Sequence, residues 1–195
     1  MITLAVLAIV AFAATNIDDV FVLLAYFSSS TVKATQVVIG TYVGMAVLVV
    51  AALMLSAVFQ VLLPNDLGLL GALPILVGLR QFWTAWRDRG NDVVDIATGT
   101  GAYENIELVA IRTVANGADN VAVYIPLFAG QTRAAVVLTC VVFAMLIGAW
   151  CLGAKWVVAN STLAAPIRRW GRWITPLVLI ALGVFVFLSN RVSLS

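Results

Sequence analysis

The chain has 195 residues, of which 63% are hydrophobic and only 10% are charged. Soluble domains carry roughly 25% charged residues, so this composition excludes an ordinary soluble domain and is typical of a protein that crosses a membrane several times. The formal net charge of +2 and the lack of a basic amphipathic stretch argue against nucleic acid as a partner. We therefore expect the lipid bilayer to surround most of the chain.

Six hydrophobic runs are long enough to cross a bilayer and predict six transmembrane helices. The runs cover residues 2–27, 35–62, 68–86, 106–129, 134–158 and 173–190. The first run lacks the basic segment that begins a signal peptide, so we expect it to be a transmembrane helix and not a cleaved leader. The longest polar connection, residues 87–104, separates two sets of three helices.

The two sets of helices resemble each other weakly. When Asn16 is aligned with Asn116, Asp19 falls on Asp119. Because each set has an odd number of helices, the second must enter the membrane from the opposite face, as in the inverted repeats of many secondary transporters. The predicted fold is therefore an all-α membrane protein with six transmembrane helices built as a 3+3 inverted repeat. Chance similarity between apolar helices is the alternative.

This fold predicts a single transporter domain over residues 1–195. Repeat 1 covers about 1–86, a cytoplasmic loop about 87–104, and repeat 2 about 105–195. Most basic residues flank the first, third and fifth connections: Lys33, Arg80, Arg87, Arg89, Lys155, Arg168, Arg169 and Arg172. The opposite side has only Arg133 and Arg191. By the positive-inside rule the first, third and fifth connections are cytoplasmic, which predicts that both termini lie outside the cell.

Two polar clusters interrupt the first and fourth runs, at residues 16–19 and 116–120. A carboxylate inside a membrane costs several kcal/mol by most estimates, so its presence indicates a functional site. Residues three or four apart share a helix face. If the two halves pack about a pseudo-twofold axis, the two clusters face one another and line one cavity with carboxylate and amide oxygens. Such oxygens suit hard or borderline divalent cations.

The predicted ion-binding residues are Asn16, Asp18, Asp19, Asn116, Asp119 and Asn120. The carboxylates of Asp18, Asp19 and Asp119 are the predicted metal ligands. The candidate accessory residues are Thr15, Tyr42 and Tyr124. Neighbouring carboxylates repel one another when both are ionised, so the pair Asp18–Asp19 is a candidate for exchanging a proton for a metal ion. The alternative is that the polar side chains only join helices by hydrogen bonds.

Three glycines and one arginine add to this pattern. Gly117 can loosen the fourth helix and expose carbonyl groups near the site. Gly40 and Gly44 form a GxxxG motif, for which we favour close packing within the chain over dimerisation. Arg112 lies on the polar stripe of the fourth helix. It is either a fixed counter-charge or a side chain that extends to the membrane interface, and we favour the interface.

Several motifs of this sequence resemble those of the bacterial cadmium resistance transporters of the CadD type, which lie within the lysine exporter (LysE) superfamily. The matching segments are residues 14–19, 39–44, 68–75, 115–120 and 124–128. The resemblance covers most of the first 130 residues. It implies a multi-pass protein of the bacterial plasma membrane that exports Cd²⁺ or a related divalent cation from the cytoplasm.

The sequence therefore predicts a secondary transporter that exports a divalent cation, with Cd²⁺ favoured, in exchange for protons. Because there is no Walker motif, we expect no ATP hydrolysis by this chain. As a transporter it is expected to have no enzymatic activity and no cofactor beyond the transported ion. The alternatives are export of Mn²⁺ or Ca²⁺, export of an amino acid or another small organic solute, and a membrane protein that transports nothing. A homo-oligomer is consistent with the sequence.

Overall fold

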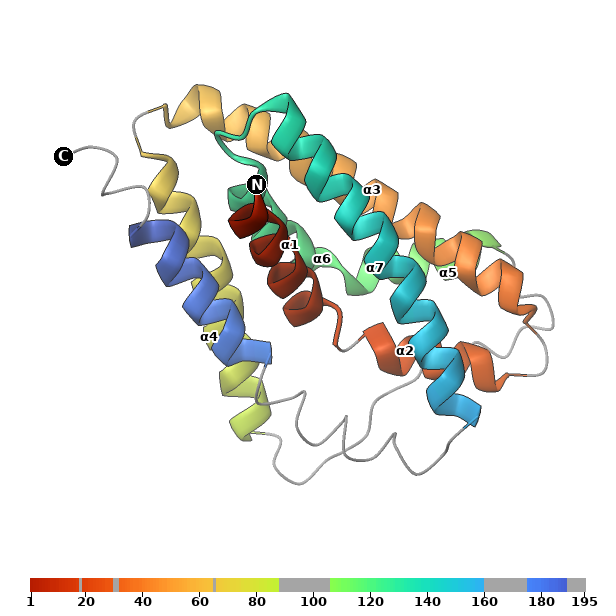
Figure 1. The fold of residues 1–195 in the computed structure, drawn as a ribbon. Helices are drawn as coiled ribbons and strands as arrows, with labels where there is room; N and C mark the ends of the chain where they lie inside the picture. The colour runs from red at the N-terminus through yellow and green to blue at the C-terminus, as the bar shows by residue number, and fades with distance from the viewer. Residues whose placement is uncertain (18, 30–31, 65, 88–105, 160–174, 189–195) are drawn as a thin grey trace.

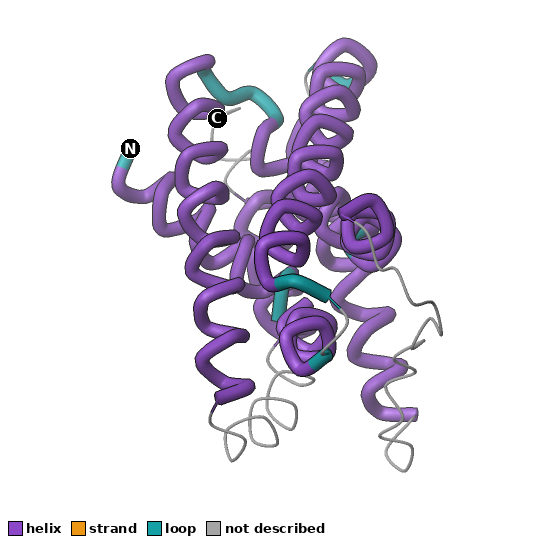
Figure 2. Tube along the Cα trace, turned by 90° about the vertical axis from the view of Figure 1, so that its right-hand side faces the viewer, coloured by secondary structure: helices purple, strands orange, loops and turns teal. Residues whose placement is uncertain are grey.

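The computed structural model describes residues 1–17, 19–29, 32–64, 66–87, 106–159 and 175–188 (Figure 1). These residues form helices α1 (Ile2–Thr15), α2 (Asp19–Ser28), α3 (Ala34–Leu62), α4 (Ala72–Arg87), α5 (Ile106–Asn116), α6 (Ala118–Phe128) and α7 (Arg133–Ala159). A 3₁₀ turn, η1 (Leu67–Gly71), precedes α4, and a further helix covers Thr175–Leu188, here called the C-terminal helix. The described residues contain no strand (Figure 2), which confirms the all-helical class.

The lengths of the first and fourth hydrophobic runs predict continuous helices, but the structure breaks each run into two helices. The break in each run falls at a polar cluster. The first run ends as α1 at Thr15 and continues as α2, which is bent by 63° from α1. The fourth run breaks at Gly117, between α5 and α6. At the first break the side chain of Asn16 donates to the carbonyl of Phe12 at 2.8 Å, a local bond of the kind that competes with helical hydrogen bonding.

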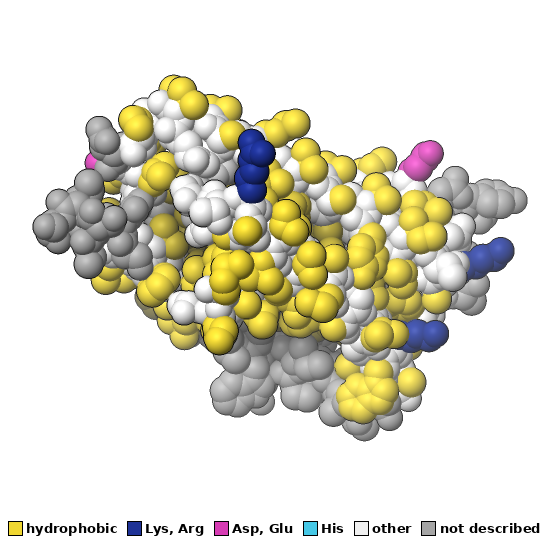
Figure 3. All heavy atoms as spheres, turned by 45° about the horizontal axis from the view of Figure 1, so that its top comes forward, with side chains coloured by type: hydrophobic (Ala, Val, Ile, Leu, Met, Phe, Trp, Pro, Cys, Tyr) yellow, Lys and Arg dark blue, Asp and Glu magenta, His cyan; other side chains and the backbone are white. Residues whose placement is uncertain are grey.

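The lengths and compositions of the helices support a membrane protein. Helix α3, the segment Leu67–Arg87 and helix α7 are long and apolar enough to cross a bilayer, and the bent pair α1–α2 adds a fourth candidate span. Hydrophobic side chains cover most of the described face in Figure 3, and charged side chains are sparse on it. Helices α5 and α6, with 11 residues each, and the C-terminal helix are too short to cross a bilayer singly. The six-span arrangement therefore stays a prediction.

Helix α3 packs in parallel against the broken pair α5–α6. A Cβ added to Gly40 would lie 2.6 Å from the Cβ of Val109, and one added to Gly44 would lie 2.5 Å from the Cβ of Thr113. These glycines therefore let the two helices approach closely. The GxxxG motif joins helices within the chain, as the sequence predicted.

Helix α7 makes the corresponding contact with the first broken pair. The ring centroids of Phe12 on α1 and Phe143 on α7 are 5.4 Å apart, and Trp150, two turns further along α7, lies 5.6 Å from the same Phe12 ring. The long helix of each half thus packs against the broken helix of the other half. The two sets of helices interleave and bury one core between them.

The last helices of the two halves pack against each other in opposite directions. Gly71 contacts Gly183 and Phe187, whereas Gly78, further along α4, contacts Ile180 and Pro176. Figure 1 shows α4 and the C-terminal helix side by side at one edge of the molecule. The predicted cytoplasmic loop, from residue 88 onward, lies outside the described residues.

Candidate functional site

The two helix breaks lie against each other, and a network of neutral polar side chains joins them. The amide Nδ2 of Asn16 donates to the hydroxyl of Tyr124 on α6 at 3.0 Å. The hydroxyl of Thr15 lies 3.2 Å from the same Tyr124 oxygen. Asn16 is 2% exposed and Tyr124 is fully buried. Since buried polar groups are costly unless they are paired, this network fixes the end of α1 to α6.

A carboxylate stands beside this network in the first turn of each following helix. Asp19 begins α2, and Asp119 lies in the first turn of α6. The backbone N–H groups at a helix N-terminus interact favourably with a negative charge. Asp119 also accepts a 3.1 Å hydrogen bond from the backbone N–H of Asn120. The structure therefore gives the two aligned carboxylates equivalent local surroundings in the two halves.

Both carboxylates lie where the two breaks meet, since Asn120, the residue after Asp119, donates to Asn16 in the break that precedes Asp19. Asn116, the last residue of α5, donates its side-chain amide to the carboxylate of Asp19, so the second half supplies a partner to the carboxylate of the first. Oxygen atoms from both halves are thus gathered in one place, which is what a cation site between two repeats requires.

One acceptor in this group has no hydrogen-bond partner among the described residues. Asn120 is fully buried and donates its Nδ2 to the Oδ1 of Asn16 at 3.4 Å. Its own Oδ1 is buried and unsatisfied. Unpaired buried acceptors are rare in native proteins and call for an explanation such as an ion or a water molecule. A cation beside Asp19 and Asp119 would supply the missing partner.

Two residues outside the sequence-predicted set also contact the site. Gln81 on α4 donates its amide to the Oδ2 of Asp119 at 2.7 Å, and the charge of its neighbour Arg80 attracts the same carboxylate. Trp150 on α7 donates its indole N–H to the backbone carbonyl of Asn16 at 2.7 Å. Gln81 lies near the end of its hydrophobic run, where a polar residue is ordinary, so no sequence signal distinguishes it.

The family model for cadmium resistance transporters matches residues 12–194, which include both helix breaks and all of the described site. The chain belongs to the cadmium resistance transporter family. This confirms the resemblance on which the sequence-based prediction drew. Searches of curated proteins and of solved structures returned no match to the chain.

Membership of a transporter family gives the site its context. A member of the cadmium resistance transporter family that is rich in apolar helices is a membrane protein, and metal-ion export is the activity that the family suggests. The two partly buried carboxylates then lie in a member of a transporter family. Oxygen donors from the two halves of such a transporter are chemically able to replace part of the hydration shell of a divalent cation.

The structure does not bring every predicted residue of this cadmium resistance transporter into the site. Asp18 lies outside the described residues. The hydroxyl of Tyr42 donates to the carbonyl of Ala144 on α7 at 2.7 Å, away from the network that joins the breaks. Within the described part of the chain, no three His, Cys, Asp or Glu side chains converge in a way that could hold a metal ion. The two described carboxylates would have to act together with amide oxygens.

Arg112 packs against the other half of the protein. Its guanidinium carbon lies 5.6 Å from the ring centroid of Tyr26 on α2, which is the range of a cation–π contact. Tyr26 is itself buried. Arg112 therefore lies over a buried ring one helical turn before Asn116, and this contact does not favour the predicted extension to the membrane interface.

Proposed function

We propose that this protein is a secondary transporter that exports a divalent metal cation, Cd²⁺ in the first place, from the cytoplasm in exchange for protons. The observation that carries this proposal is the junction of the two breaks, where Asn116 donates to Asp19 and Asn120, next to Asp119, donates to Asn16. Carboxylates buried among apolar helices are costly unless a cation or a proton compensates them. Membership of the cadmium resistance transporter family supports Cd²⁺ as that cation.

The proposed site binds the ion with oxygen atoms only. Asp19 and Asp119 supply the charge, and the unpaired Oδ1 of Asn120 supplies a neutral ligand. Asn116 and Gln81 now donate N–H groups to the two carboxylates, so an entering cation would replace these two bonds. Cd²⁺ is a soft ion that prefers thiolate, and an oxygen site would hold it weakly enough to release it.

Proton exchange follows from the closeness of the two carboxylates. When the cation leaves, two negative charges would remain together among apolar helices, and electrostatic repulsion opposes that state. Uptake of a proton by one of them removes the repulsion and resets the site. Binding of the next divalent cation then releases the proton. A pH gradient across the membrane would drive the cycle.

The helix directions support six crossings in a 3+3 inverted repeat. In a chain that crosses a membrane six times, the second and fourth spans run in parallel, as do the first and fifth, whereas the third and sixth are antiparallel. The observed contacts have these directions: Gly40 and Gly44 contact α5, Phe12 contacts α7, and Gly71 contacts Gly183. Each half would then present its break to the other at mid-membrane, as in other inverted-repeat transporters.

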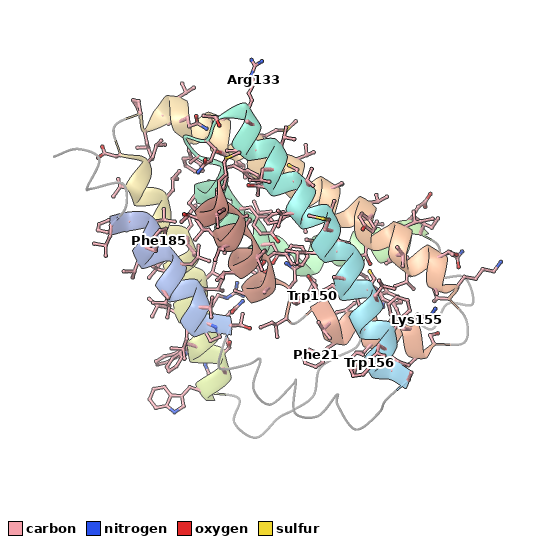
Figure 4. The ribbon with its side chains drawn as sticks, viewed as in Figure 1. Phe21, Arg133, Trp150, Lys155, Trp156 and Phe185 are labelled. Atoms are coloured by element: carbon pink, nitrogen blue, oxygen red, sulfur yellow. The ribbon has the colours of Figure 1, made fainter. Side chains whose placement is uncertain are left out.

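We propose that the protein lies in the plasma membrane of a bacterium, with both termini outside the cell. Helix α7 begins at Arg133 and carries Lys155 near its other end. Figure 4 shows Arg133 extending away from the helices at one end of the molecule. The positive-inside rule assigns the end with more basic residues, which has Lys155, to the cytoplasm.

The oxygen-only ligand set keeps a second substrate class open. Mn²⁺ and Ca²⁺ are harder than Cd²⁺ and favour carboxylate and amide oxygens. A panel of Cd²⁺, Zn²⁺, Mn²⁺ and Ca²⁺ in proteoliposomes, with and without a pH gradient, separates these candidates. We expect Cd²⁺ transport that the pH gradient accelerates. Transport of Mn²⁺ or Ca²⁺ in preference to Cd²⁺ would reassign the substrate, and transport of none of the four would contradict the proposal.

Variants connect transport to the proposed ligands. Asp19→Asn and Asp119→Asn remove one negative charge each with almost no change in shape, and each should abolish Cd²⁺ transport. Asp66→Asn is the matched control, because Asp66 is exposed and precedes the η1 turn. All variants are compared at equal amounts of folded protein. Full transport by Asp19→Asn and Asp119→Asn would show that the ion passes elsewhere.

A further inference from the structure

The first break has a backbone carbonyl that the helix cannot satisfy. Helix α1 ends at Thr15, and the N–H of Asn16 still bonds to the carbonyl of Phe12. The carbonyl of Asn16 itself accepts a 2.7 Å hydrogen bond from the indole N–H of Trp150. Because membrane interiors offer no water to an exposed carbonyl, a break in a helix needs such a partner from elsewhere in the protein.

Trp150 belongs to the other half of the chain, 134 residues away along the sequence. Its ring also packs edge-on against Phe12, with centroids 5.6 Å apart and planes at 89°. Figure 4 shows Trp150 on the side of α7 that faces the end of α1. One side chain thus contacts both the last turn of α1 and the residue at which that helix ends.

Among the described residues, no tryptophan donates a hydrogen bond to the second break in this way. At Gly117 the side chain of Leu48 on α3 fills the space that a Cβ would need. Leu48 on α3 and Trp150 on α7 each lie on the long helix of one half and contact the break of the other half. At equivalent places, therefore, one break contacts a hydrogen-bond donor and the other contacts an aliphatic side chain.

We propose that Trp150 is a positioning residue of the transport site, a role that rests on the proposed function. It fixes the break after α1 to helix α7, so that Asn16 and the following Asp19 keep their places when the two halves move. The contact of Leu48 with Gly117 is aliphatic and therefore non-directional, so Gly117 can shift relative to α3 without losing a hydrogen bond. The first break is thus the fixed side of the site, and the second is the side that adjusts.

Trp150→Phe tests this role, because it removes the N–H donor and keeps a smaller aromatic ring beside Phe12. Trp156→Phe is the matched control, since Trp156 lies six residues further on α7 and is 61% exposed. In proteoliposomes with equal folded protein, Trp150→Phe should raise KM for Cd²⁺ about three- to tenfold, the effect of losing one hydrogen bond. Its maximal rate should change less than twofold, and the control should change neither value.

At equal folded protein, a merely structural role would leave both KM and the maximal rate unchanged and would lower only the melting temperature of Trp150→Phe. That result would overturn the inference. Amide hydrogen exchange of the purified protein gives a readout that needs no transport. We expect faster exchange in residues 12–22 of Trp150→Phe than in the wild type, and unchanged exchange in α3. Equal exchange in residues 12–22 would also overturn it.

The two measurements separate this inference from the proposed function. If the wild-type protein moved no cation but Trp150→Phe still loosened residues 12–22, the proposed function would be wrong, and the anchoring of the break would stand. If the wild type transported Cd²⁺ and Trp150→Phe left both KM and exchange unchanged, the transporter would stand and the role of Trp150 would be wrong.

Discussion

Gly71 and Gly183 contact each other across the last helices of the two halves: a Cβ added to either would lie 2.5 Å from the carbonyl oxygen of the other. This reciprocal contact is what a two-fold relationship between the halves produces. The two residues come from segments that the sequence aligns only weakly. Their backbones approach so closely that no larger residue fits without movement of a helix.

Replacing Gly183 by alanine should therefore weaken the packing of the C-terminal helix on α4. The added methyl group meets a backbone oxygen, which cannot turn away, so we expect a loss of about 1–3 kcal/mol in stability. Thermal unfolding in detergent measures it. Gly153→Ala on α7 is the control, because a Cβ there meets nothing within 4 Å. Equal melting temperatures for the two variants would contradict the close contact.

Tyr124→Phe should destabilise the junction between the two breaks. The substitution removes the hydroxyl to which Asn16 donates and which lies beside Thr15, while both residues keep their bonds within α1. We expect a cost of about 0.5–1.5 kcal/mol in the free energy of unfolding, the net effect of one lost hydrogen bond. Tyr42→Phe removes an exposed hydroxyl bond to Ala144 and should cost less. A larger loss for Tyr42→Phe than for Tyr124→Phe would argue against the buried network.

Gln81→Leu should change the affinity for the cation. The amide of Gln81 donates a hydrogen bond to the carboxylate of Asp119, so an entering ion must displace this amide. Without this competitor the ion should bind more tightly, with a KM about three- to tenfold lower, and leave more slowly. Gln60→Leu on α3 is the control, because Gln60 donates to Ser56 on its own helix. An unchanged KM in Gln81→Leu would mean that Asp119 does not bind the ion.

Hydropathy predicted the long helices closely. The runs at residues 35–62 and 134–158 correspond to α3 and α7, whose observed ends differ by one residue at most. Length and apolar composition decide such helices, and both are local properties. Hydropathy did not predict the breaks, because Thr15, Asn16 and Gly117 stand within runs that are apolar enough on average. Side-chain bonds to the backbone and the packing around Gly117 decide them.

The site itself was predicted in part. The cost of burying carboxylates and amides singled out Asp19, Asp119 and their neighbours, and the structure brings Asn16, Asn116 and Asn120 to the same place. Gln81 and Trp150 could not be found in this way. Their roles depend on how α4 and α7 pack against the breaks, and neither residue type is unusual in its own helix.

In the proposed site one divalent cation binds between the two breaks, with Asp19 and Asp119 as ligands. Equilibrium dialysis of Cd²⁺ against the purified protein tests this binding most directly, in the wild type and in Asp19→Asn, Asp119→Asn and the control Asp66→Asn. We expect one ion per chain in the wild type and in Asp66→Asn, and at least about tenfold weaker binding in the other two variants, since each loses a charged ligand. Equal Cd²⁺ affinity in all four proteins would contradict it.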